Sequence, residues 1–67
     1  MKIKRAVQSP YDVVGLLEDG DVVPIIIEEG WFKISEFNTV ELIGLTVMEA
    51  ESYIWEFYVE CPAAIQA

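Results

Sequence analysis

The dipeptide Asp19-Gly20 lies between two strongly apolar segments, residues 11–18 and 21–28. Asp-Gly is typical of a type I′ turn, in which both central residues require a positive φ. The flanking segments are rich in the β-branched and aliphatic residues that favour strands. We therefore predict a β-hairpin formed by residues 11–18 and 21–28, and any fold for this chain must accommodate it.

A two-residue turn would also set the register of the hairpin. With Glu18 opposite Asp21, the expected cross-strand pairs are Leu17–Val22, Leu16–Val23, Gly15–Pro24, Val14–Ile25 and Val13–Ile26. Pro24 has no N–H to donate to a ladder, and proline within a sheet is confined to edges and bulges. We therefore expect a free edge or a bulge beside Pro24.

Both faces of the predicted hairpin are apolar, whereas an antiparallel sheet with one face in water alternates apolar and polar residues. A chain of 67 residues buries only about 60% of its unfolded surface. Cys61 is the only cysteine, so an intrachain disulfide cannot supplement the core. We therefore expect a homodimer that forms through the apolar surface of the sheet and helix.

The segment after Gly30 predicts two further elements. Ser35 followed by Glu36 is typical of a helix N-terminus, which predicts one short helix near residues 35–40. Residues 40–48 are rich in β-branched side chains and predict a strand. Residues 1–9 are expected to be a loose strand or tail and residues 61–67 a loose tail, with Cys61 a small, partly buried hydrophobe.

Residues 46–60 permit two interpretations. In a helix, Thr46 and Glu49 would form a capping box, and one side of the helix would be apolar. In a strand, the aromatic and β-branched sequence YIWEFYV would fill residues 53–60, and we favour this interpretation. The predicted fold is thus α+β. It is a single domain over residues 1–67, with a small antiparallel sheet of three to four strands and one short helix.

The charge of the chain is unevenly distributed. The net charge is −8, yet three of the four basic residues fall within the first five positions. From position 6 onward there are twelve acidic residues and one basic residue, Lys33, which gives a net charge of −11. Such a body repels nucleic acid and membrane surfaces and is attracted to basic ones. Solubility is the simpler explanation of the same charge.

Enzyme chemistry finds little support in the sequence. There is no histidine, and no glycine-rich loop precedes a helix. Glu28 and Glu29 are neighbours, but neighbouring strand residues point to opposite faces. We therefore expect no enzyme activity, no metal and no cofactor. No apolar run is long enough to span a bilayer, and one free cysteine suits a reducing cytoplasm, where we expect the protein to act.

A set of short motifs falls at a shared spacing between residues 11 and 37. The motifs are YDV at 11–13, LL at 16–17, acidic residues at Asp19 and Asp21, and Ser-acid-Phe at 35–37. In these twenty-seven residues the chain resembles the smallest phage-encoded inhibitors of uracil-DNA glycosylase, which are dimeric DNA mimics. The resemblance implies a three-stranded antiparallel sheet with one short helix, paired with its copy.

The resemblance also implies site residues. The phenylalanine of the Ser-acid-Phe motif, here Phe37, would occupy or line the apolar pocket that receives the DNA-intercalating leucine loop of the glycosylase. The acidic residue of the motif, Glu36, would replace a DNA phosphate. The other candidates for partner binding are Glu28, Glu29, Glu41 and Trp31, with Phe32 as a rival aromatic anchor. Considered without the resemblance, Phe37 would be a core residue, and both interpretations stay open.

The chain departs from the family pattern in three places. A family glutamate falls opposite Ile27, so Glu28 could replace it only with a bulge or slip. A family tyrosine falls opposite Glu41, so we expect no aromatic side chain to support Phe37 from there. The C-terminal residues 51–67 have no counterpart in the family.

The leading hypothesis is therefore a protein inhibitor of the host's uracil-DNA glycosylase that occupies the enzyme's DNA-binding groove, with no direct binding of nucleic acid or membrane. Two alternatives remain. One is an acidic phage-type inhibitor of another nucleic-acid enzyme, such as an anti-restriction or anti-CRISPR protein. The other is a small β-rich assembly subunit.

Overall fold

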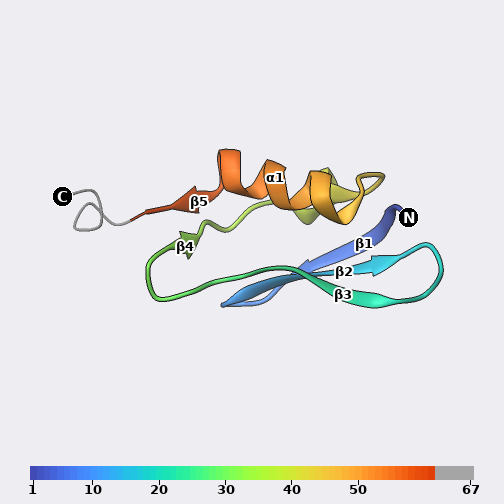
Figure 1. The fold of residues 1–67 in the computed structure, drawn as a ribbon, viewed down its shortest axis with the longest axis horizontal. Coiled ribbons are helices and arrows are strands. Elements are labelled where there is room, and N and C mark those ends of the chain that lie inside the picture. The colour runs from blue at the N-terminus through green and yellow to red at the C-terminus, as the bar shows by residue number, and fades with distance from the viewer. Residues whose placement is uncertain (62–67) are drawn as a thin grey trace.

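The computed structural model of the chain describes residues 1–61. A three-stranded antiparallel sheet, in the order β1-β2-β3, forms one layer, and the helical elements form a second layer over one of its faces (Figure 1). The elements in chain order are β1 (Ile3–Gln8), β2 (Asp12–Leu17), β3 (Val22–Ile27), β4 (Lys33–Ile34), the 3₁₀ helix η1 (Thr39–Leu42), α1 (Val47–Phe57) and β5 (Val59–Glu60). Strands β4 and β5 pair as a separate small sheet. The predicted α+β class is confirmed.

The hairpin predicted from Asp19-Gly20 is confirmed as β2 and β3, but its turn type is different. The Leu17 N–H donates to the Asp21 carbonyl at 2.8 Å, so the loop contains three residues, 18–20. Gly20 has a φ of 93°, and within residues 1–61 only glycines have positive φ. A type I′ turn is therefore wrong, because it would require a positive φ at Asp19 as well. The loop belongs to the three-residue class that ends in a left-handed glycine.

The longer loop shifts the register near the turn. The observed pairs are Leu16–Val22, Gly15–Val23, Val14–Pro24, Val13–Ile26 and Asp12–Ile27. Ile25 is therefore an extra residue in β3, and the predicted bulge beside Pro24 is confirmed. Counting along the ladder from the hydrogen-bonded Leu17–Asp21 pair, Val14–Pro24 is a non-hydrogen-bonded pair. The missing proline N–H thus falls on the free edge of the sheet.

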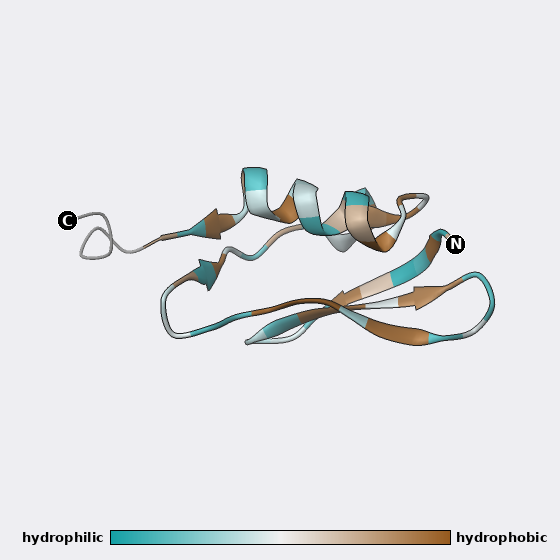
Figure 2. Cartoon of the chain, in the orientation of Figure 1, coloured by the Kyte–Doolittle hydropathy of each residue, from teal (hydrophilic) through white to brown (hydrophobic). Residues whose placement is uncertain are grey.

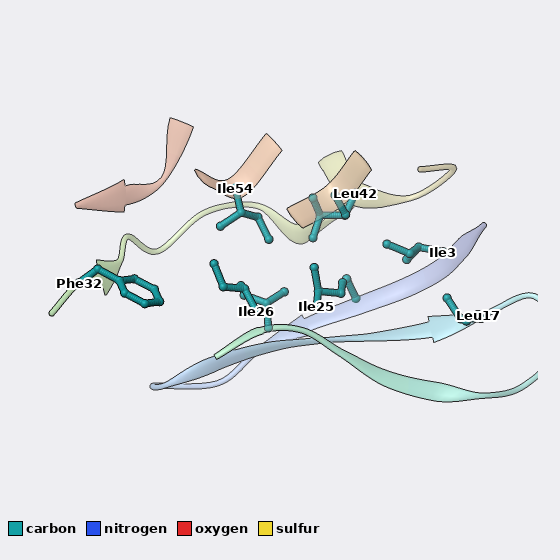
Figure 3. Packing of buried hydrophobic residues seen from close by; sticks show 10 residues of the cluster. Ile3, Leu17, Ile25, Ile26, Phe32, Leu42 and Ile54 are labelled. Atoms are coloured by element: carbon teal, nitrogen blue, oxygen red, sulfur yellow. The ribbon is translucent and has the colours of Figure 1, made fainter. Parts of the chain in front are cut away.

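The core lies between the sheet and the helical layer (Figure 3). Its buried apolar residues are Ile3, Ala6, Val13, Leu17, Ile25, Ile26, Phe32, Leu42, Ala50 and Ile54. Gly15 faces this core, where a Cβ built on it would come within 2.9 Å of the Ile25 Cδ1 atom. A glycine at this position allows the Ile25 side chain to pack directly against the backbone of β2.

The other face of the sheet, here called the outer face, is mostly apolar. The register places Val7, Val14, Leu16, Val22, Pro24 and Ile27 on it, together with the charged residues Arg5 and Asp12. Val7 and Val22 are 59% and 67% exposed. Among residues 1–61, all elements outside the sheet lie on the side of the core, away from the outer face (Figure 1). Figure 2 shows that much of β2 and β3 consists of hydrophobic residues. The outer face therefore has no cover within the described part of the chain.

Of the two alternatives for residues 1–9, the strand is observed and the loose tail is not, because residues 3–8 form strand β1. Ile3 is 2% exposed. Its N–H donates to the Leu45 carbonyl at 2.8 Å, and its carbonyl accepts from the Gly44 N–H at 2.9 Å. These bonds hold the first strand against the segment that follows η1.

The strands predicted at 40–48 and 53–60 are also wrong. Residues 39–42 form η1, Gly44 turns the chain with a φ of 90°, and α1 occupies most of the remainder. The Thr46 Oγ1 atom accepts from the Glu49 N–H, and the Glu49 carboxylate accepts from the Thr46 N–H. This capping box begins α1 and overrides the strand propensity of the aromatic residues after it.

The short helix predicted near residues 35–40 begins later, at Thr39, where the Asn38 side chain caps η1. Ser35 is not the cap, because it lies four residues before η1, and its N–H donates to the Tyr58 carbonyl. Cys61 is exposed rather than partly buried. The remainder of the predicted tail, 62–67, lies outside the described residues. No helix within residues 1–61 has the length and hydropathy needed to cross a membrane.

Candidate functional site

The Phe37 ring is half-buried and stacks on a second aromatic ring. Its centroid lies 4.4 Å from that of Tyr58, with an angle of 12° between the two planes. Stacked pairs of this kind contribute about 0.5–1.5 kcal/mol beyond the area they bury. Phe37 packs against the edge of the core without entering it, so its ring is held in place and still reaches the surface.

The backbone of Phe37 is fixed by a side chain from β1. The Gln8 Nε2 group donates to the Ser35 carbonyl at 3.0 Å, and the Gln8 Oε1 atom accepts from the Phe37 N–H at 3.1 Å. The Ser35 N–H donates to the Tyr58 carbonyl at 2.7 Å. Residues 35–37 are therefore tied to the end of β1 on one side and to the end of α1 on the other.

Glu41 holds the ring on which Phe37 stacks. Its carboxylate accepts from the Tyr58 hydroxyl at 2.6 Å and from the Tyr53 hydroxyl at 3.1 Å. The hydrogen bond to Glu41 raises the pKa of the Tyr58 phenol well above its usual range, because it favours the protonated form. Position 41 holds no aromatic side chain to support Phe37, and the support comes from Tyr58 in the C-terminal segment instead.

A groove of about 670 Å³, here called the Phe37 groove, runs beside this ring. It lies between the end of β1 and the segment 34–39. Its lining residues are Ala6, Val7, Gln8, Ser9, Pro10, Ile34, Glu36, Phe37 and Thr39. Glu36 is exposed and contributes a carboxylate to an otherwise mostly apolar or neutral surface. The structure therefore brings Phe37, Glu36 and Glu41 together around one part of the surface.

Glu28 has a structural contact. Its carboxylate accepts from the Ile34 N–H at 3.2 Å and is half-buried there, which ties β4 to the end of β3. Strand β3 contains a bulge at Ile25, three residues before Glu28.

The last two candidates, Glu29 and Trp31, lie apart from the Phe37 groove. Trp31 donates from Nε1 to the Glu29 carboxylate at 3.1 Å, and its ring stacks on Trp55 beside β3. Phe32, the rival anchor, is a core residue with 3% exposure. The predicted partner-binding residues therefore divide between two surfaces.

Three residues of the site escaped the sequence analysis: Gln8, Tyr53 and Tyr58. Gln8 bonds to residues that are 27 and 29 positions away in the chain, and no local sequence pattern predicts such contacts. The two tyrosines depend on α1. The signal that could have found them is the capping box at Thr46 and Glu49, because a helix from that point carries both rings toward Glu41.

The Phe37 groove and the side chains around it form a surface that another protein could contact. It offers a stacked aromatic ring, a groove and carboxylates, which can receive apolar and basic side chains of another protein. Within residues 1–61, no group of three or more carboxylate or thiol side chains is placed to hold a metal ion. A scan against protein-family models, a search of curated proteins and a search of solved structures each found no match to this chain.

Proposed function

We propose that this protein inhibits uracil-DNA glycosylase by occupying the DNA-binding groove of the enzyme in place of DNA. The spacing of motifs from residue 11 to residue 37 supports this target, because it resembles that of the small phage-encoded inhibitors. The net charge of −11 over residues 6–67 supports the mode of binding. A DNA-binding groove is basic, and long-range attraction to it speeds association at low salt.

The observation that carries the proposal is the support given to the Phe37 ring. Tyr58 holds its face and Gln8 holds its backbone, so the ring is ordered before any partner arrives. An ordered anchor loses little side-chain freedom on binding. In this mechanism the ring and its groove engage the apolar side chain of the enzyme's DNA-intercalating loop, and Glu36 and Glu41 face basic residues around it.

We further propose that two copies associate through the outer face of the sheet. Monomeric proteins rarely expose contiguous apolar patches larger than a few hundred Å². Pairing along the β3 edge is disfavoured by Pro24, and the β1 edge is bonded to residues 44 and 45 at Ile3. Face-to-face packing therefore remains as the route to a dimer, and sedimentation equilibrium of the purified chain would measure it. A monomer at all concentrations would contradict it.

The function is tested by titrating the protein into a uracil-excision assay with the glycosylase and a uracil-containing oligonucleotide. Stoichiometric inhibition is expected for the natural sequence. Phe37→Ala is expected to weaken inhibition by about 30-fold or more, the effect of losing an anchor worth at least about 2 kcal/mol. Met48→Ala is the control, because it removes an exposed apolar side chain that does not line the Phe37 groove. It should inhibit normally.

Circular dichroism of Phe37→Ala separates binding from folding. Lost inhibition with an intact spectrum supports the proposal, whereas an unfolded variant shows that Phe37 acts mainly as a core residue. Full glycosylase activity at excess natural protein contradicts the proposed target. The two alternatives, an inhibitor of another nucleic-acid enzyme in the host cytoplasm and a small assembly subunit, would then remain.

A further inference from the structure

A second aromatic surface lies beside the edge strand β3, whereas the Phe37 groove lies beside the other edge strand, β1. Trp31 and Trp55, the only two tryptophans in the chain, stack with ring centroids 5.5 Å apart and an angle of 26°. Beneath them lies the buried ring of Phe32, at 4.6 Å from Trp31 and 4.8 Å from Trp55. Trp31 is 44% exposed and Trp55 is 38% exposed. The two indoles therefore cover the core at Phe32 and also present aromatic surface to solvent.

These rings border a hollow of about 410 Å³, here called the tryptophan hollow. It is formed between β3 and α1. Its lining residues are Pro24, Ile25, Ile26, Ile27, Glu29, Trp31, Phe32, Glu51 and Trp55. The lining thus contains aromatic rings, aliphatic side chains and two carboxylates, and within the described residues 1–61 it contains no basic side chain.

The carboxylates are placed beside the indoles. Glu29 accepts the Trp31 Nε1–H at 3.1 Å, which positions that indole and leaves the second carboxylate oxygen without an indole donor. Glu51 precedes Trp55 by four residues on α1, so the two side chains lie on the same side of the helix. Both glutamates are exposed. A group entering the hollow would meet two aromatic rings and two negative charges.

We propose that the tryptophan hollow binds the guanidinium group of an arginine side chain on a basic protein partner. A cation over the face of tryptophan is attracted by the ring quadrupole. Guanidinium is favoured over ammonium because it is planar, stacks on aromatic faces and can bond two carboxylate oxygens at once. The strongly acidic body of this chain brings basic partners to the surface. The inference does not depend on the identity of that partner.

The tryptophans themselves report on this site, because both lie in it. The test is a titration of the purified protein with triarginine amide, followed by tryptophan emission in about 0.15 M salt, where general charge attraction is screened. A saturable emission change is expected, with binding several-fold tighter than that of trilysine amide. Equal affinity for the two peptides would overturn the assignment to guanidinium.

Two glutamates on the same helix provide a matched pair of variants. Glu51→Gln removes a carboxylate from the hollow and should weaken triarginine binding by about two- to five-fold, as expected for an exposed ion pair. Glu56→Gln removes the same charge from a position that does not line the hollow and should leave the affinity unchanged. If both variants weaken binding equally, the peptide is held by net charge alone and the proposal fails.

A third variant tests the aromatic contribution. Trp55→Leu keeps an apolar side chain over Phe32 and leaves Trp31 as the reporter. It should weaken triarginine binding by about two- to five-fold, the effect of one exposed cation–π contact. Circular dichroism checks that the fold is retained. Unchanged affinity in a folded Trp55→Leu variant would overturn the proposal.

Discussion

The Phe37 groove and the tryptophan hollow use similar residues in different ways. Each combines stacked aromatic rings with carboxylates, and they lie beside opposite edge strands of the sheet, β1 and β3. At the groove, Glu41 accepts from two tyrosine hydroxyls. At the hollow, Glu29 accepts one indole N–H, and within residues 1–61 Glu51 accepts no hydrogen bond. Both carboxylate oxygens of Glu41 are therefore bonded to tyrosine hydroxyls, whereas at the hollow Glu51 and one oxygen of Glu29 accept no side-chain hydrogen bond within residues 1–61.

The two surfaces nevertheless depend on the same helix. On α1, Tyr53 faces Glu41 and Trp55 faces the hollow, and between them Ile54 is fully buried in the core. The orientation of one helix therefore controls both surfaces. Some substitutions should therefore disturb both surfaces, and others should disturb only one. The largest effects are expected for those that disturb both.

The largest effect is expected for Ile54→Ala, which should disturb both surfaces. Removing a fully buried isoleucine creates a cavity and should lower the free energy of unfolding by about 2–5 kcal/mol. Urea denaturation followed by circular dichroism measures this. Met48→Ala on the same helix is the control, because Met48 is 81% exposed and should change stability by less than about 0.5 kcal/mol. Similar losses for the two variants would contradict the position of Ile54 in the core.

A smaller effect on both surfaces is expected for Thr46→Ala. This variant removes the side-chain cap of α1 and should cost about 1 kcal/mol of stability. It should loosen the groove and the hollow equally, because the cap is distant from both along the helix. Chemical denaturation at neutral pH measures the loss, and an unchanged stability would show that tertiary packing alone holds the start of α1.

The same cap makes stability depend on pH. Hydrogen bonds from the backbone and side chain of Thr46 lower the pKa of Glu49 from its usual 4.5. The ionised carboxylate is therefore favoured in the folded state, and its contribution is present above pH 4.5 and is lost as the pH falls through the lower, folded-state pKa. The difference in stability between the natural chain and Glu49→Gln should shrink across that acidic range. A difference that stays constant to low pH would contradict this assignment.

The smallest and most selective effect is expected for Tyr58→Phe. This variant keeps the ring that stacks on Phe37 and removes the hydroxyl that bonds Glu41. The raised pKa of Tyr58 means that the folded state holds its proton more tightly. The hydroxyl of Tyr58 therefore contributes to stability at pH values below 10.0, the usual pKa of tyrosine, and this contribution is lost as the pH rises above 10.0.

Tyrosinate absorbance measures this effect directly. In the natural chain, alkaline titration of the folded protein should show less tyrosinate just above pH 10 than the denatured chain, and Tyr58→Phe should reduce this difference. The tryptophan emission of the variant should match that of the natural chain, because the hollow does not contain Tyr58. A change in that emission would show that the two surfaces are coupled.

The N-terminal half of the fold was largely predictable from the sequence. Asp19-Gly20 marks a turn through local chemistry, and Pro24 correctly indicated a bulge. The predicted turn type and the register near it were wrong. The dipeptide Asp19-Gly20 is equally compatible with a three-residue loop in which Gly20 alone is in the left-handed region. For strand β1 the sequence left a loose strand and a tail both open, because it alternates poorly and contacts with β2 and with residues 44–45 hold the strand in place.

The C-terminal half shows how a local propensity can mislead. Residues 53–57 contain aromatic side chains that favour strands in general, yet they form the end of α1. A capping box at Thr46 starts a helix, and Ala50 and Ile54 then fall on one buried side of it. Of the candidate site, the Ser-acid-Phe motif indicated Glu36 and Phe37, whereas Glu41 was one of several further candidates. The support from Gln8 and Tyr58 arises only from the tertiary fold.

Pro24 has a further consequence for the behaviour of the chain before it folds. It interrupts the sequence VVPIII of β3, which otherwise consists of β-branched residues alone. Uninterrupted, uncharged segments of this length are those that stack into amyloid-like cross-β fibrils. A proline within such a segment opposes this stacking, because each added strand must donate hydrogen bonds along both edges. The residue that places a bulge in the folded sheet thus also protects the most aggregation-prone segment of the unfolded chain.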